Sequence, residues 1–99
     1  MIGDDVGEGS RREKSYRGIS QRLAAHYLGN LGGEAVSENG EGTVDAVKGD
    51  DWSAELSSGK ASVGPSVELT EVTVVFEGDP ETLDELVRKF SQKAMRAGG

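Results

Sequence analysis

The sequence has 99 residues, which is enough for one small domain. Eighteen acidic against eleven basic side chains give a formal net charge of −7, so we expect neither nucleic acid nor an anionic membrane surface as a partner. The absence of cysteine excludes disulfides, thiolate metal sites and thiol catalysis, and one histidine leaves no His-rich metal site. No apolar run approaches the roughly 18 residues of a membrane span. These features predict a soluble, cytoplasmic, single-domain protein without a cofactor.

The first 14 residues are acidic and rich in glycine, with few bulky apolar side chains. Such a segment buries too little surface to offset its ordering entropy, so residues 1–14 are predicted to be a disordered tail and residues 15–99 a single domain. Ser15–Arg17 is predicted to form a short first strand. The basic side chains around it are interpreted as a solvated flank.

A helical period follows the first strand. Apolar residues recur at spacings of three and four and therefore lie on one helix face. Ser20 or Gly18 is suited to the N-cap, and Gly32-Gly33 to the end of the helix. His26 lies at the edge of the apolar face, and because no Cys or Ser partner accompanies it, we expect function not to depend on it. The apolar positions are Ile19, Leu23, Ala24, Tyr27, Leu28 and Leu31.

The middle of the chain reads as short strands separated by turns. Turn residues cluster at 39–42, 49–51, 57–59 and 64–65. Ser58-Gly59-Lys60 resembles part of a P-loop, but Ala54 stands where that motif needs glycine, so we interpret the segment as a hairpin turn. Asp50-Asp51 lacks the downstream residues of an EF-hand.

The longest predicted strand, Ser66–Glu77, changes phase along its length. Val67 and Leu69 occupy odd positions, whereas Val72, Val74 and Phe76 occupy even ones. A slip of one residue moves side chains to the other face of a sheet, so we predict a β-bulge near Thr70-Glu71.

Other polar and aromatic residues in this region have simple structural interpretations. Asp45, Glu55 and Glu68 alternate outward and are assigned to a solvated face, although two of them could in principle act as a pair of catalytic acids. Trp52 and Tyr27 are assigned to the core, with a ligand pocket as the alternative.

The last element is the most strongly marked helix. Asp79 is suited to the N-cap, Pro80 to the first helical position and Gly98 to the position after the helix. An apolar face runs from Leu83 to Ala97. Together the elements predict an α+β domain in the order β-α-β(4)-α, with a curved antiparallel sheet and both helices on one face.

Ala97-Gly98-Gly99 allows two interpretations. Ubiquitin-like modifiers and sulfur carriers end in Gly-Gly, because an activating enzyme must draw the terminal carboxylate into a narrow site. A helix runs up to the glycines here, however, and two free residues reach only about 7 Å. We therefore favour a helix cap, and keep thiocarboxylation or conjugation at Gly98 and Gly99 as the alternative.

Several segments resemble the C-terminal domain of MoaD-related proteins. The resemblance covers about residues 16–99 and implies a fold similar to that of the TATA-binding protein. Such domains occur joined to a β-grasp sulfur carrier of the molybdopterin-synthase type, a half that this chain does not contain. The segments are Tyr16–Ser20, Arg22–Ala24, Tyr27-Leu28, Leu31–Gly33, Trp52–Leu56, Val63–Ser66, Leu69–Val74, Phe76–Asp79 and Phe90–Arg96.

The resemblance implies a pathway context rather than a reaction, and it brings no catalytic residues. The first functional hypothesis is a non-enzymatic accessory or interaction module, acting beside a β-grasp sulfur carrier or its activating enzyme in molybdopterin biosynthesis. The second is a carrier activated at its own Gly98-Gly99 end. The oligomeric state is open. The excess of carboxylates is typical of halophilic proteins and predicts stabilisation by salt.

Overall fold

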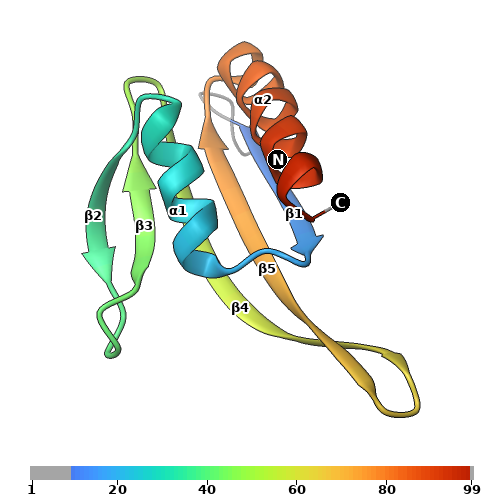
Figure 1. Ribbon diagram of the computed structural model, residues 1–99. Coiled ribbons are helices and arrows are strands. Elements are labelled where there is room, and N and C mark those ends of the chain that lie inside the picture. Colours follow the sequence, from blue (N-terminus) through green and yellow to red (C-terminus); the bar gives the residue numbers. More distant parts are fainter. Residues whose placement is uncertain (1–9, 99) are drawn as a thin grey trace, which may run out of the picture.

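The computed structural model describes residues 10–98 and shows an α+β domain (Figure 1). Five antiparallel strands form one open sheet in the spatial order β1-β5-β4-β3-β2. The strands are β1 (Ser10–Arg17), β2 (Glu34–Glu38), β3 (Val44–Lys48), β4 (Trp52–Gly64) and β5 (Val67–Gly78), and the helices are α1 (Gln21–Asn30) and α2 (Pro80–Gly98). The predicted α+β class is confirmed, and both helices lie on the same face of the sheet.

The helix ends follow the capping residues that the sequence marks. The Leu23 N–H donates to Ser20 Oγ at 3.1 Å, which makes Ser20 the N-cap of α1. Gly32, with a φ of 101°, supplies the left-handed conformation directly after the C-cap of that helix, Leu31. At α2, the Thr82 N–H donates to Asp79 Oδ2 at 3.1 Å. Both predicted helices are therefore confirmed.

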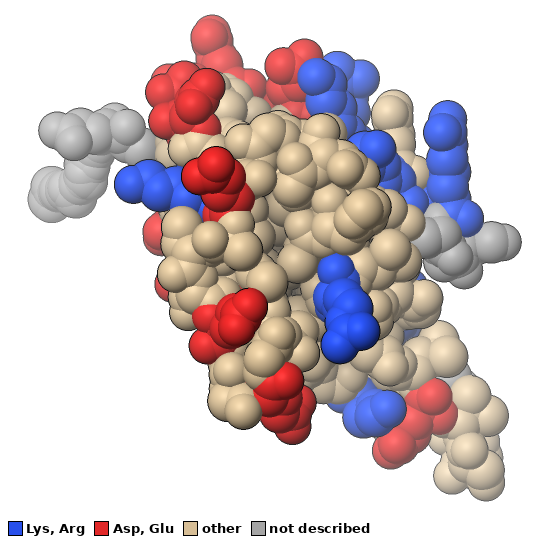
Figure 2. Space-filling view, turned by 60° about the vertical axis from the view of Figure 1, so that its left-hand side comes forward, with Lys and Arg blue, Asp and Glu red and all other residues tan. Residues whose placement is uncertain are grey.

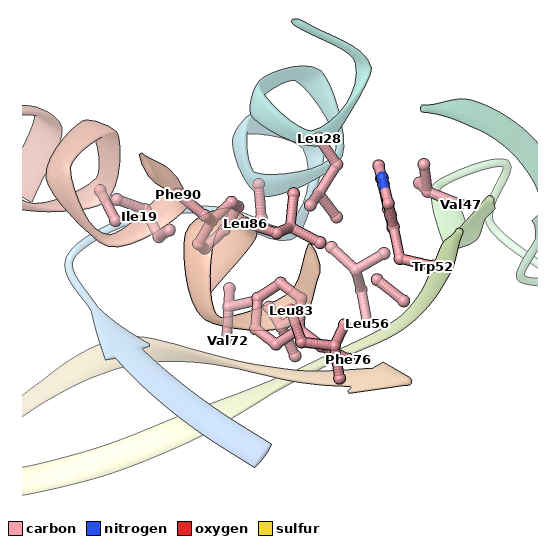
Figure 3. Close-up of a cluster of buried hydrophobic side chains, with 14 residues drawn as sticks. Ile19, Leu28, Val47, Trp52, Leu56, Val72, Phe76, Leu83, Leu86 and Phe90 are labelled. Carbon is pink, nitrogen blue, oxygen red and sulfur yellow. The ribbon is translucent and has the colours of Figure 1, made fainter. Parts of the chain in front are cut away.

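The core lies between the helices and the sheet (Figure 3). Leu28 from α1 and Leu83 and Phe90 from α2 are fully buried against Val74 and Phe76 of β5. The Phe90 ring meets the Phe76 ring edge to face, with centroids 5.8 Å apart. Trp52 belongs to the same cluster at 8% exposure, which confirms its assignment to the core. The two helices thus share one apolar layer, which anchors α1 against the sheet.

The first strand is longer than the sequence predicted. β1 begins at Ser10, and each residue from there to Arg17 pairs with β5. Arg12 donates to Asp84 of α2 at 3.1 Å, and Arg17 to Glu71 of β5 at 3.3 Å. The backbone ladder to β5 extends the strand to Ser10, and these exposed ion pairs only supplement it. Residues 1–9 of the predicted tail lie outside the described residues.

Two predictions within the long hairpin are wrong. Residues 57–59 form no turn, because β4 continues from Trp52 to Gly64. The ladder is also regular through Thr70 and Glu71, and the register shift lies between Ser62 and Gly64, beside the hairpin turn. The phase change needs no bulge, because Val67 and Leu69 lie beyond the helices, where they are 51% and 40% exposed.

From Val67 to Thr70, β5 pairs only with β4. We call this two-stranded part of the hairpin, residues 60–70, the arm. Figure 1 shows it projecting past both helices. The domain is accordingly elongated, with extents of 45 × 28 × 28 Å. Neither described helix is long and apolar enough to cross a membrane.

Candidate functional site

A groove with a mixed apolar and cationic lining lies between α1 and the β2–β3 hairpin. It has a volume of about 270 Å³. We call it the α1 groove. Its lining residues are Arg22, Ala25, His26, Gly29, Ala35, Gly42, Thr43, Val44 and Val47.

The groove exists because small residues stand where α1 passes β2. A Cβ added at Gly29 would meet no atom within 4 Å, so the helix leaves open space at that turn. Ala25 and Ala35 also line the groove and have only a methyl group to fill it. Val47, 2% exposed, belongs both to the core and to the groove wall. The groove is therefore the rim of the core, left uncovered by small side chains.

A polar contact fixes the hairpin against the helix beside this groove. Gln21, at the start of α1, is only 8% exposed, and its Nε2 donates to the Val44 carbonyl oxygen at 2.9 Å. A buried amide that is held in this way resists displacement, because breaking the bond would leave polar atoms unpaired away from water. The Gln21 contact thus sets the spacing between α1 and β3.

The charge of the α1 groove is opposite to that of the chain. None of its lining residues is acidic, and its two ionisable members are Arg22 and His26. Arg22 forms no ion pair within residues 10–98, whereas four other arginines do. Figure 2, which brings this side forward, shows a broad uncharged surface with acidic side chains along one border and a basic side chain lying on it, while other basic side chains lie next to acidic ones at the edges.

A second hollow lies on the opposite face of the sheet. Asp45 and Glu55, which the sequence suggested as a possible acid pair, both line it, but Glu68 lies on the arm. One carboxylate oxygen of Asp45, Oδ1, is buried and accepts no hydrogen bond from the described residues. Glu55 is exposed, in agreement with its assignment to the solvated face.

Tyr16 is the one described group whose pKa is clearly perturbed. Burial of the ring raises the pKa above its ordinary value, and a hydrogen bond with Ser91 opposes this rise. The two hydroxyl oxygens lie 2.8 Å apart, and the ring meets Phe90 edge to face at 5.0 Å. This group ties β1 to α2 and faces neither hollow, so we assign it to the stability of the fold.

The remaining predicted site residues are dispersed. Gly98 is the last residue of α2, one position inside the helix rather than after it, and Gly99 lies outside the described residues. Asp50 and Asp51 lie in the β3–β4 connection. Among residues 10–98, no three His, Cys, Asp or Glu side chains gather as metal ligands would. His26 is exposed at the groove rim, where its ring lies 6.3 Å from that of Tyr27.

Sequence reasoning missed the α1 groove. Arg22 and Gly29 lie on the polar side of the α1 pattern and carry no motif. The one available signal was a run of small residues, Ala25 and Gly29, on the helix side next to Arg22. Whether such residues face solvent or a sheet depends on which strand lies beneath them, and local periodicity does not contain that information.

The protein is a small α+β domain in which one layer of helices covers one face of an open sheet and a groove lies beside α1. Within this class, the chain belongs to the family described as archaeal MoaD-like protein, whose model matches residues 12–99. The match confirms the MoaD-related resemblance; it begins within β1 and includes every later strand and helix. None of the curated proteins matches the chain.

Proposed function

We propose that the chain is a non-enzymatic interaction module that acts beside a sulfur-carrier protein or the enzyme that activates one. Its membership of the archaeal MoaD-like family supports the sulfur-carrier context. The α1 groove is apolar and edged by the Arg22 guanidinium, which forms no ion pair in the described part of the chain, and this supports a binding role. A cytoplasmic place in molybdopterin biosynthesis and a fold of the TATA-binding-protein type are the finer parts of this proposal.

The observation that carries the proposal is the continuation of α2 to Gly98. A carrier presents an extended tail to its activating enzyme, and unwinding a formed helix at that moment would reduce the affinity. Here the helix is anchored by Phe90 and Ala94, which are 0% and 4% exposed. The helical end therefore supports a module over a carrier.

The alternative is a sulfur carrier or modifier that is activated at Gly98-Gly99. One observation favours it: Met95 is 72% exposed and Arg96 is exposed, so the turn after Ala94 begins without buried side chains. Unwinding from Met95 would free five residues and about 17 Å of reach, using roughly 3.4 Å per extended residue. This alternative requires that Gly99 end in a free carboxylate.

The two functions separate when Gly98 and Gly99 are deleted. For a module, the free energy of unfolding should fall by a few tenths to about 1 kcal/mol, and proteins that co-purify from the native cell should be unchanged. Mass spectrometry of the intact chain provides the second measurement. A Gly99 thiocarboxylate, or a Gly-Gly remnant of this chain on a lysine of another protein, would replace the module by the carrier.

A further inference from the structure

The charge contrast of the α1 groove points to its ligand. The chain as a whole repels anions, since its net charge is −7. Within the groove the balance is reversed, because Arg22 and His26 line it and no acid does. Because Arg22 forms no ion pair with the acidic residues among 10–98, its guanidinium donors can bind an external acceptor. A planar guanidinium matches a carboxylate in particular.

The lining also limits the size and polarity of the ligand. About 270 Å³ is just below the usual range of drug-sized pockets, so a body of only a few carbon atoms fits. Val44 and Val47 form an apolar wall, and Thr43 adds a hydroxyl group next to them. Branched or linear aliphatic carbons match this wall, whereas a sugar or a nucleotide would bring many polar groups without partners.

We propose that the α1 groove is a binding site for a small aliphatic carboxylate. The carboxylate lies on the Arg22 guanidinium at the rim, and the hydrocarbon part lies on Val44 and Val47 beneath Ala25 and Gly29. The site goes beyond the proposed function, and it can be tested without any protein partner.

The first test titrates the isotopically labelled protein with 4-methylvalerate and records amide chemical shifts. We expect saturable shifts at Gly29, Ala35 and Thr43, with a dissociation constant of about 1 mM for so small a probe. The uncharged analogue 4-methylvaleramide should bind at least tenfold more weakly. Equal binding of acid and amide, or shifts that do not saturate, would overturn the proposal.

Arg22→Gln tests the anchor. The variant removes the charge but keeps an exposed polar side chain on α1, and we expect at least a tenfold weaker affinity for 4-methylvalerate. Arg96→Gln is the matched control, since Arg96 also forms no ion pair among residues 10–98 but lies on α2, far along the chain from the groove. An equal loss of affinity in the two variants would show that the ligand responds only to the total positive charge, and would contradict the proposal.

Gly29→Leu tests the cavity. A larger side chain has open space there and suits a helix better than glycine, so the variant should fold and occlude the groove. Loss of 4-methylvalerate shifts is the expected result. Gly59→Leu, which also adds a side chain in open space but on β4, should bind as the parent does. Unchanged binding in Gly29→Leu would place the ligand elsewhere.

A last comparison identifies the source of the carboxylate. N-acetyl-glycyl-valine carries the same acid and a similar aliphatic group at the end of a peptide. We expect it to bind no more tightly than 4-methylvalerate, because the groove is sized for one short body. A tenfold tighter affinity for the peptide would assign the groove to the end of a polypeptide chain and would overturn the choice of a free acid.

Discussion

The two ends of the β4–β5 hairpin have the same secondary structure but different support. Toward Gly78, β5 lies between β1 and β4 under α2, and Val72, Val74 and Phe76 are fully buried. In the arm, residues 60–70, the strands pair only with each other and Val67 and Leu69 are exposed. A lone hairpin is only marginally stable in water. Cover by the helices and pairing with the third strand, β1, therefore together decide how much each half contributes to stability.

The strongest test of this contrast is Phe76→Ala. Phe76 is fully buried beside Phe90, and its loss should cost about 3–5 kcal/mol of unfolding free energy. Leu69→Ala in the arm, where the side chain is 40% exposed, should cost less than about 1 kcal/mol. Urea denaturation measures both. Similar costs would show that the arm is packed in solution.

Adding a methyl group to a glycine should also change stability differently in the two regions, but by a smaller amount. A Cβ at Gly33 would clash with the Val47 side chain and the Trp52 ring, so Gly33→Ala should destabilise by about 1–3 kcal/mol. Gly59→Ala, at the base of the arm, meets no atom within 4 Å and should be neutral or slightly stabilising. Thermal melts of both variants measure the difference, and equal melting temperatures would contradict the packing around Trp52.

High pH should weaken the covered half through Tyr16. Burial raises the pKa of this phenol in the folded state, so the native protein keeps its proton at a pH where the unfolded chain loses it. The contribution is present below about pH 10 and is lost as pH rises through the folded-state pKa. Tyr16→Phe should lower stability by about 1 kcal/mol at neutral pH and reduce the alkaline loss. Melts from pH 8 to 11 would contradict this if the loss were unchanged.

Added salt should change stability the least for each charged side chain, and it should act on the whole domain. Screening of like charges should raise the melting temperature from low to molar potassium chloride, since the net charge is −7. The arm contains one lysine and one glutamate, Lys60 and Glu68, so its amide exchange should respond less than the global melt. A flat or falling melting temperature would contradict the expectation of salt stabilisation.

The sequence predicted the parts of the fold that local chemistry determines. Asp79 and Ser20 fix the helix starts through hydrogen bonds over three residues, and both positions were correct. The hairpin was misjudged because alternation shows which residues share a face, but not where the covering helices end. Ser57–Gly59 looks like a turn in isolation, yet cross-strand pairing with Val72 and Thr73 keeps it extended. The α1 groove was missed because Arg22 and Ala35 come to line one groove only when α1 packs beside the β2–β3 hairpin. Local periodicity does not contain that arrangement.

Trp52 gives this architecture an optical consequence. It is the only tryptophan, and its indole packs so closely on Gly49 that a Cβ there would clash with the ring. Intrinsic indole fluorescence therefore reports on one corner of the molecule, where the β3–β4 connection lies near the C-terminal end of α1 and the first half of α2. Fraying of the arm leaves that corner intact and produces no change in emission, so opening of residues 60–70 is spectroscopically silent, whereas collapse of the covered half shifts the emission to the red.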